Sequence, residues 1–212
     1  MKNVDITMIL DRSGSMGSMT GQVIKSFNDF LLEQKAVEGK AAISLIQFDD
    51  QYEINYVAAD IQDAKDLNGD TYQPRGMTAL LDAIGRTIVS IKERRSTSEQ
   101  TDDLVVVITT DGMENASEEY TRRQIREMIK ECEDDLGWKF IYLAADEESF
   151  EQYEDFGMKQ GRSIKMGRGG DAYDHASKLM SAKLGLYRHG GNEDDLDFTD
   201  KEREEADNLD QG

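Results

Sequence analysis

The sequence is poor in the residues that build disulfide frameworks and nucleophilic catalytic sites. Its 212 residues include one cysteine and two histidines. A single cysteine excludes an internal disulfide, and two isolated histidines do not supply a serine–histidine–aspartate triad. Cys132 shares a predicted helix face with the apolar residues Ile125 and Ile129, which favours a thiol in the core over a nucleophile.

Long hydrophobic runs are also missing. No apolar stretch approaches the about 18 residues that indicate a membrane-spanning helix. The first apolar run begins at Val4, which leaves no room for a leader with a charged segment followed by an apolar one. These two absences predict a cytoplasmic protein.

Basic residues are few compared with acidic ones. Lys and Arg total 25 and Asp and Glu total 44, which gives a net charge of -19. An acidic surface repels nucleic acids and anionic membranes over a Debye length, which is roughly 8 Å at physiological salt. We therefore expect neither a nucleic acid nor a membrane as a partner.

The most informative segment of the chain stands close to its start. The apolar run Val4 to Leu10 predicts a buried strand, and Asp11, Ser13 and Ser15 follow it at every second position. One carboxylate and two hydroxyls thus stand at the carboxyl end of a strand, where an α/β sheet usually binds its ligands. Oxygen ligands of this kind suit a small, hard divalent cation.

Two later segments supply similar groups. The run Leu104 to Ile108 predicts a strand buried on both faces, and Asp111 follows it in the segment Thr-Thr-Asp-Gly. Thr78 stands at the start of a predicted helix and offers a third hydroxyl. Each residue alone could cap a helix or end a strand in a turn. Capping does not explain why all of them occur together.

The pattern of these residues resembles the metal-ion-dependent adhesion site of von Willebrand factor type A domains. That pattern is Asp-x-Ser-x-Ser, a distant Thr and a distant Asp, and it is matched here by Asp11, Ser13, Ser15, Thr78 and Asp111. The resemblance covers about residues 3–188. It implies a domain that binds a protein partner through a metal ion. The lack of a leader favours an intracellular bacterial or phage-like type over the extracellular adhesion proteins.

The donor set favours Mg²⁺ first and Mn²⁺ second. All five side chains offer oxygen, and the absence of His and Cys argues against zinc. Mg²⁺ takes six oxygen ligands and gives up its waters reluctantly, so five small side chains leave positions filled by water. The resemblance implies that Ser13, Ser15 and Thr78 ligate directly, and that an Asp or Glu of the partner replaces a water.

The partner must bring a carboxylate to an acidic protein. We therefore expect its acidic side chain to lie within a basic rim, and association to slow as salt is raised. Residues close in sequence to the ligands are candidates for the surface that it touches, or they fill gaps beneath the loops. These candidates are Arg12, Met16, Met77, Met113 and Glu114.

Strand and helix patterns alternate along the chain, which predicts a doubly wound, Rossmann-like α/β fold with helices on both faces of a mostly parallel sheet. Strands are expected over residues 41–48, 52–57, 138–145 and 161–166, and helices over 17–38, 78–94, 118–134, 149–156 and 171–187. The short loop after residue 48 makes the next strand antiparallel at the sheet edge.

Residues 1–190 form the predicted domain, and residues 191–212 form an acidic, partly disordered tail. Within this tail, Thr199 to Glu202 has the form of a capping box.

Two other functions have to be weighed. A metal-dependent phosphoryl-transfer enzyme could use a strand-end Asp, but Ser13 stands where an Asp-x-Asp pair would carry that chemistry, and Glu114 is the only acid close to Asp111 that could act as a base. Alternatively, the metal could be purely structural and hold the loops in place. The leading hypothesis is a non-enzymatic interaction module.

Overall fold

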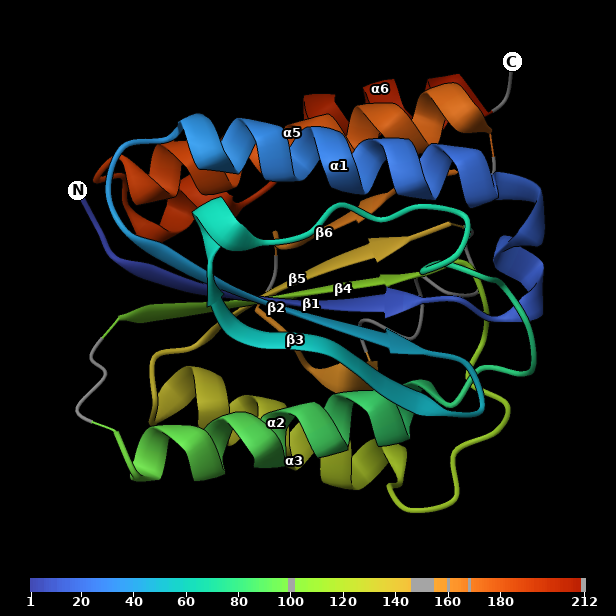
Figure 1. Cartoon of the computed structure of the whole chain (residues 1–212), viewed down its shortest axis with the longest axis horizontal. Coiled ribbons are helices and arrows are strands. Elements are labelled where there is room, and N and C mark those ends of the chain that lie inside the picture. The colour runs from blue at the N-terminus through green and yellow to red at the C-terminus, as the bar shows by residue number, and fades with distance from the viewer. Residues whose placement is uncertain (99–101, 146–154, 160, 168, 211–212) are drawn as a thin grey trace.

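A six-stranded sheet forms the centre of the protein (Figure 1). The computed structural model describes residues 1–98, 102–145, 155–159, 161–167 and 169–210. The strand order is β3-β2-β1-β4-β5-β6, and only the β2–β3 pair among these strands is antiparallel. The strands are β1 (Val4–Asp11), β2 (Ala41–Phe48), β3 (Tyr52–Asp60), β4 (Asp103–Thr110), β5 (Lys139–Ala144) and β6 (Ser163–Lys165).

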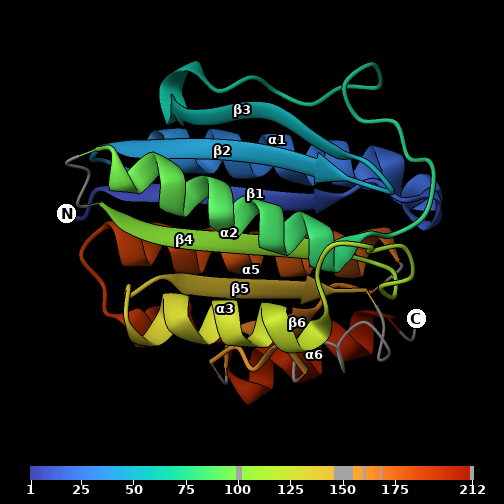
Figure 2. The same ribbon diagram turned by 90° about the horizontal axis from the view of Figure 1, so that it is seen from below.

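Helices cover both faces of the sheet, as Figures 1 and 2 show. One face carries α1 (Thr20–Ala36), α5 (Gly170–Arg188) and α6 (Asp200–Asp210). The other carries α2 (Leu80–Ser96) and α3 (Arg122–Asp134). Short 3-10 helices are η1 (Gly14–Met19), η2 (Ile61–Asp63) and η3 (Glu193–Leu196). The predicted doubly wound fold is confirmed. Within the described ranges, none of the helices has both the length and the apolar character needed to cross a membrane.

The apolar sequence of the central strands follows from burial on both faces. In β4, Val105 and Val107 pack in the core beneath α1 and α5, whereas Val106 and Ile108 pack in the core above α2 and α3. Successive side chains of a strand point to opposite faces of the sheet. In a strand that is buried on both faces, the odd-numbered and the even-numbered positions must therefore all be apolar. Cys132 is fully buried in the second core, and burial raises its pKa to about 12, as expected of an inert core thiol.

The pairing of β1 with β4 positions the predicted site. Leu10 lies opposite Thr109 in a parallel register, so the two strands end at the same edge of the sheet. Asp11 closes β1 and Asp111 directly follows β4. The structure therefore confirms that these carboxylates meet at the topological switch point, where the order of the strands reverses.

Three helices begin later than the sequence predicts, among them α2, which begins at Leu80 instead of residue 78. The expected helix over residues 17–38 begins as the 3-10 turn η1 and becomes α-helical at Thr20. The helix expected from residue 118 begins at Arg122, because the backbone N–H groups of residues 118–120 donate to the carboxylate of Asp82 instead of entering a helix. The short helix expected over residues 149–156 falls largely outside the described residues.

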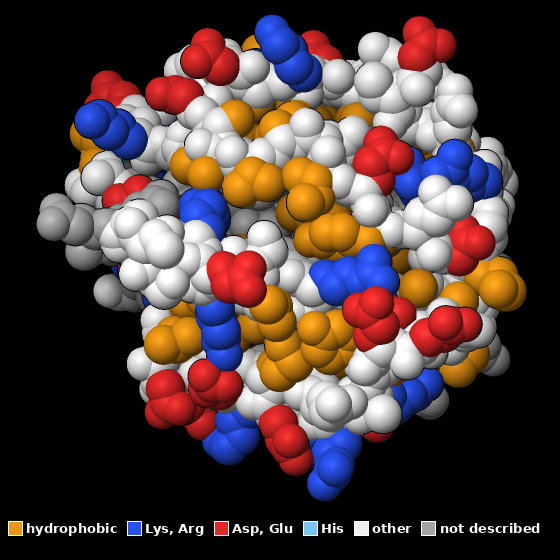
Figure 3. All heavy atoms as spheres, turned by 60° about the horizontal axis from the view of Figure 1, so that its bottom comes forward, with side chains coloured by type: hydrophobic (Ala, Val, Ile, Leu, Met, Phe, Trp, Pro, Cys, Tyr) orange, Lys and Arg blue, Asp and Glu red, His pale blue; other side chains and the backbone are white. Residues whose placement is uncertain are grey.

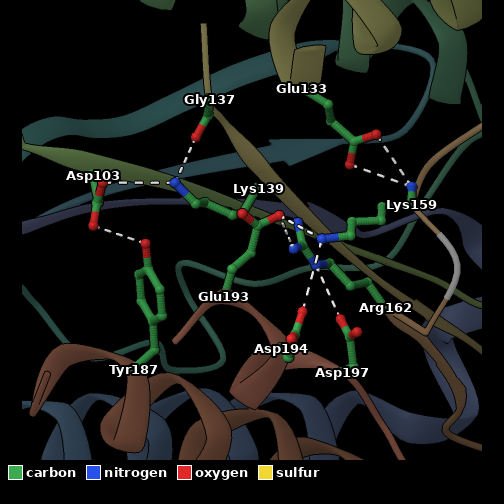
Figure 4. A network of polar contacts seen from close by, with 10 residues as sticks. All are labelled: Asp103, Glu133, Gly137, Lys139, Lys159, Arg162, Tyr187, Glu193, Asp194 and Asp197. Carbon is green, nitrogen blue, oxygen red and sulfur yellow. Dashed lines mark hydrogen bonds and ion pairs between the residues drawn. The ribbon is translucent and has the colours of Figure 1, made fainter. Parts of the chain in front are cut away.

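The acidic C-terminal segment is folded, which differs from the expected partly disordered tail. Leu196 and Phe198 are 0% and 3% exposed and belong to the core beneath α1 and α5. Figure 4 shows that the fully buried Arg162 lies between Glu193 and Asp197 of this segment, with which it forms ion pairs. The acidic residues that suggested disorder thus neutralise a buried guanidinium.

Helix α6 closes the β6 edge of the sheet. The predicted capping box is present, because Thr199 and Glu202 exchange hydrogen bonds between side chain and backbone. From the first turns of α6, the guanidinium of Arg203 donates to the carbonyl oxygens of Gly161 and Ser163 at distances of 2.8 and 3.2 Å. The helix therefore satisfies backbone acceptors at the end of the sheet.

We predict that Phe198→Ala lowers the free energy of unfolding by about 3–5 kcal/mol, because it removes a buried aromatic ring and leaves a cavity. Urea unfolding followed by circular dichroism measures the change. Lys201→Ala, at a side chain that is 82% exposed, is the control and should leave stability nearly unchanged. An equally small effect of both substitutions would show that the segment does not belong to the folded core.

Candidate metal site

The five predicted ligands lie at the carboxyl edge of the sheet. Asp11 ends β1, Ser13 and Ser15 lie in the turn into η1, Thr78 precedes α2, and Asp111 follows β4. All except Ser15 are at most 3% exposed, whereas Ser15 reaches the surface. The edge therefore presents several buried oxygen atoms beneath one exposed hydroxyl.

Hydrogen bonds connect the loops that follow β1 and β4. Ser15 Oγ donates to Asp111 Oδ1 at 2.6 Å and lies 3.0 Å from Ser13 Oγ. The backbone N–H of Ser13 donates to Asp11 Oδ1 at 2.6 Å. Four of the predicted ligands thus form one continuous cluster of oxygen atoms drawn from two loops.

Thr78 completes the cluster across Gly112. A Cβ atom on Gly112 would lie 3.2 Å from Thr78 Oγ1 and 3.5 Å from Ser15 Oγ. The hydroxyls of Thr78 and Ser15 therefore face the same small space, which a glycine leaves open. All five predicted ligands are brought together by the fold.

The cluster contains two buried carboxylates, which is electrostatically unfavourable. The pKa of Asp11 is raised to about 7, mainly by burial and in smaller part by the negative charge of Asp111, against the opposing effect of hydrogen bonds from Thr110 and Ser13. Among the described residues, no Lys or Arg forms an ion pair with Asp11. A buried anion without a counter-charge is costly, and a divalent cation among these oxygens would remove that cost. The residues present fit such an ion.

The sequence and the fold agree with a known family. The sequence model of the von Willebrand factor type A domain matches residues 5–169. The chain belongs to this family. The matched range runs from β1 to the residue before α5, so it contains all five residues of the cluster.

Several solved structures share the fold. They include proximal thread matrix protein 1 from the mussel byssus (TM-score 0.62, 15% identity, covering 85% of this chain and 48% of that one). A second is the pilus adhesin SpaC from Lactobacillus rhamnosus GG (TM-score 0.67, 14% identity, covering 89% of this chain and 31% of that one). A third is the vWF domain of the type V pili tip protein Mfa5 from Porphyromonas gingivalis (TM-score 0.59, 12% identity, covering 90% of this chain and 98% of that one). The chain spans less than half the length of the first two. No curated protein matches the sequence.

An ion-pair network next to the site fixes the first loop of the vWA domain. Asp49 is fully buried, and its Oδ2 lies 3.2 Å from Arg12 Nε and 2.8 Å from Arg75 Nε. Two backbone hydrogen bonds run in parallel with these pairs, from Gly14 N to Gly76 O and from Arg75 N to Arg12 O. The turn that carries the serines is thereby tied to the segment that leads to Thr78.

A second network fixes the loop after β4. Thr78 and Asn115 exchange two hydrogen bonds of 2.9 and 3.0 Å. The carboxylate of Glu114 accepts from the backbone N–H of Leu81 and from both the N–H and the hydroxyl of Ser117. The start of α2 and the segment after Asp111 therefore hold each other in place.

The predicted partner surface is only partly exposed. Met77 and Met113 are 56% and 43% exposed and flank the cluster. Met16 is fully buried and Arg12 is 4% exposed, so the expectation that they touch a partner is wrong for this structure: Met16 fills the core and Arg12 pairs with Asp49. Glu114 is half-buried and occupied by its loop.

Sequence reasoning missed several residues that support the site. Thr110 Oγ1 donates to Asp11 Oδ2 at 2.6 Å, and the buried hydroxyl of Tyr72 donates to the carbonyl of Asp11 at 2.7 Å. Thr110 stands directly before Asp111 at a strand end, and that position could have indicated a supporting role. Nothing in the sequence around Tyr72 or Asp49 links them to a site that is distant along the chain.

We predict that Asp49→Ala lowers the free energy of unfolding by about 3 kcal/mol, because the buried guanidinium of Arg12 pairs with Asp49 and Glu53 and would keep only Glu53. Urea unfolding in EDTA measures this change without any contribution of metal. The neighbouring Asp50→Ala, at an exposed carboxylate, is the matched control. Equal stability of the two variants would contradict the proposed role of the network.

Proposed function

We propose that this vWA domain binds Mg²⁺, with Mn²⁺ as the second choice, and uses the ion to bind a carboxylate of a protein partner. The ligands are Asp11, Ser13, Ser15, Thr78 and Asp111, in the pattern of a metal-ion-dependent adhesion site. The observation that carries the proposal is the convergence of their oxygen atoms from three loops onto one point of the sheet edge. vWA domains commonly mediate protein–protein interactions, and two of the similar structures come from a pilus adhesin and a pilus tip protein.

The donor set supports a hard cation. Two carboxylates match the charge of a divalent ion, and three hydroxyls add neutral oxygen ligands. When bound, the ion supplies a Lewis-acidic position to which an outside oxygen can bind. The role of the chain is to hold its five oxygens in place through the networks of Asp49 and Asn115.

The neutral hydroxyls explain why a partner carboxylate is the expected ligand. Four carboxylates around the ion would repel an incoming anion, whereas two carboxylates and three hydroxyls leave no excess negative charge. The exposed methionines Met77 and Met113 flank the cluster and offer adaptable apolar contacts around the incoming acid. The net charge of -19 favours a partner whose acid lies within a basic rim.

Binding, and not catalysis, is the proposed role. Glu114 is the acid nearest to Asp111 along the described sequence, and a base near the ion would have to be available to a reacting group. Its oxygens already accept hydrogen bonds from Leu81, Ala116 and Ser117. Glu114 therefore shapes a loop, and the one acid that the sequence offered as a base is engaged in these hydrogen bonds.

We predict that saturating Mg²⁺ raises the melting temperature relative to EDTA. A ligand at about 100 times its dissociation constant stabilises by about 2.7 kcal/mol, which is roughly 5–10 °C for a domain of this size. Differential scanning calorimetry of the wild type, Asp11→Asn and Thr78→Val measures the shift. Both variants should lose it, whereas Asp50→Asn should keep it. A shift that both Asp11→Asn and Thr78→Val retain would place the metal elsewhere.

We further predict that partner binding requires the metal. Capture from native lysate in Mg²⁺ should yield a protein that is lost in excess EDTA and lost with Asp11→Ala, while the variant keeps its fold in EDTA. Replacing the anchoring Asp or Glu of that protein by Ala should abolish binding, and the association rate should fall as salt is raised. A partner retained in both EDTA and the variant would show that recognition does not use the ion.

A further inference from the structure

Two methionines differ from the others in their access to solvent. Met77 and Met113 are 56% and 43% exposed. The chain has ten methionines, of which Met1 is also exposed and Met128 is half-buried. The remaining six are at most 6% exposed, namely Met8, Met16, Met19, Met158, Met166 and Met180. Apart from Met1, the most accessible thioether sulfurs therefore belong to Met77 and Met113.

The other exposed apolar side chains contain only hydrocarbon. Figure 3, which turns the side with α2 toward the viewer, shows hydrophobic side chains in a band across the surface. The large apolar side chains exposed on β3 and α2 are Ile54, Val57 and Val89. An oxidant that attacks sulfur but not hydrocarbon leaves these side chains unchanged. It acts instead at Met77 and Met113.

The fold brings these two methionines together from distant parts of the sequence. Met77 directly precedes Thr78, and Met113 directly follows Gly112. A Cβ atom on Gly112 would lie 3.2 Å from Thr78 Oγ1. Thr78 also exchanges two hydrogen bonds with Asn115. The two segments that carry the methionines therefore lie side by side, next to the proposed metal site.

Burial protects other methionines of the same region. Met16 directly follows Ser15, yet it is 0% exposed, and Met19 is 1% exposed. Both belong to the core beneath α1 and α5. Access to solvent, and not closeness in sequence to a proposed ligand, therefore separates Met77 and Met113 from these two residues. Met16 and Met19 provide an internal control.

A hydroperoxide oxidises a thioether by transfer of one oxygen atom. The sulfur lone pair attacks the outer oxygen of the peroxide, an S–O bond forms as the O–O bond breaks, and the proton leaves with the other oxygen as water. Sulfur loses two electrons and the peroxide gains them. The product, methionine sulfoxide, is polar, and methionine sulfoxide reductases convert it back to the thioether.

We propose that Met77 and Met113 form a reversible oxidation site, at which a hydroperoxide converts the apolar rim of the metal site into a polar one. The effect on a partner rests on the proposed function, in which these side chains make apolar contacts around the incoming carboxylate. Two sulfoxides weaken such contacts, whereas none of the five proposed metal ligands is altered. Oxidation therefore releases the partner without releasing the ion.

The first test measures where the protein is oxidised. The domain is treated with hydrogen peroxide in Mg²⁺, catalase stops the reaction, and mass spectrometry of tryptic peptides detects each added oxygen. Met77 and Met113 fall on separate peptides, residues 76–86 and 96–122. Both should be oxidised at least roughly tenfold faster than Met16 and Met19. Methionine sulfoxide reductases A and B should reverse the change. Equal rates at exposed and buried methionines, or sulfoxides that the reductases leave in place, would overturn the proposal.

The second test measures the consequence for binding. Peroxide should lower the amount of protein captured from lysate in Mg²⁺ at least roughly tenfold, and the reductases should restore it. The variant Met77→Leu/Met113→Leu keeps apolar side chains of similar size, so it should capture equally before and after peroxide although Met1 is still oxidised. The rise in melting temperature with Mg²⁺ should be the same before and after oxidation of the wild type.

Three results would contradict this effect on binding. Capture that oxidation leaves unchanged would show that the rim does not contribute, and an equal loss with the double leucine variant would place the sensitive group elsewhere. Loss of the Mg²⁺-dependent rise in melting temperature would show that oxidation acts on the metal site itself. If the untreated domain captures no protein in Mg²⁺, the proposed function fails, and the selectivity and reversal of oxidation alone decide the present proposal.

Discussion

The parallel pairing of β1 with β4 is the constraint on which the rest of the site depends. Their register brings the ends of both strands to one edge, and the chain places a carboxylate at each end. Burying these acids is unfavourable, as shown by the pKa of Asp11, which burial raises most and the charge of Asp111 raises in smaller part. Hydrogen bonds from Ser13, Ser15 and Thr110 offset part of this cost. A divalent cation is the simplest group that would offset the remainder.

The supporting networks show how a rigid site is made from loops. Asp49 joins two arginines of different segments in one buried ion-pair cluster, and the exchange of hydrogen bonds between Thr78 and Asn115 joins two further segments. Neither network uses the side-chain oxygen atoms of the cluster itself. Rotamers and loop positions are thus set by the fold itself, which would lower the entropy lost when the proposed ion binds.

The strands and the five clustered residues were predictable because the signals for them are local. Continuous apolar runs predicted β1 and β4, and a short motif at each strand end indicated the polar cluster. The remainder depends on contacts between residues far apart in the chain. Asp82 delays the start of α3, Met16 turns into the core instead of toward solvent, and Arg162 orders an acidic segment that composition alone assigns to disorder. Neither hydrophobic periodicity nor charge density reports such partners.

The contact of Arg203 with the carbonyl groups beside β6 gives the sheet two unlike borders. At that border a side chain already occupies the acceptors that another polypeptide would use, and α6 stands in the way. The opposite border is β3, which pairs with β2 on one side only among the described strands. The two borders of the sheet therefore differ, because α6 occupies backbone acceptors at the β6 border, whereas β3 pairs irregularly with its neighbour. The C-terminal helix thus ends the sheet at β6 and also covers part of its core.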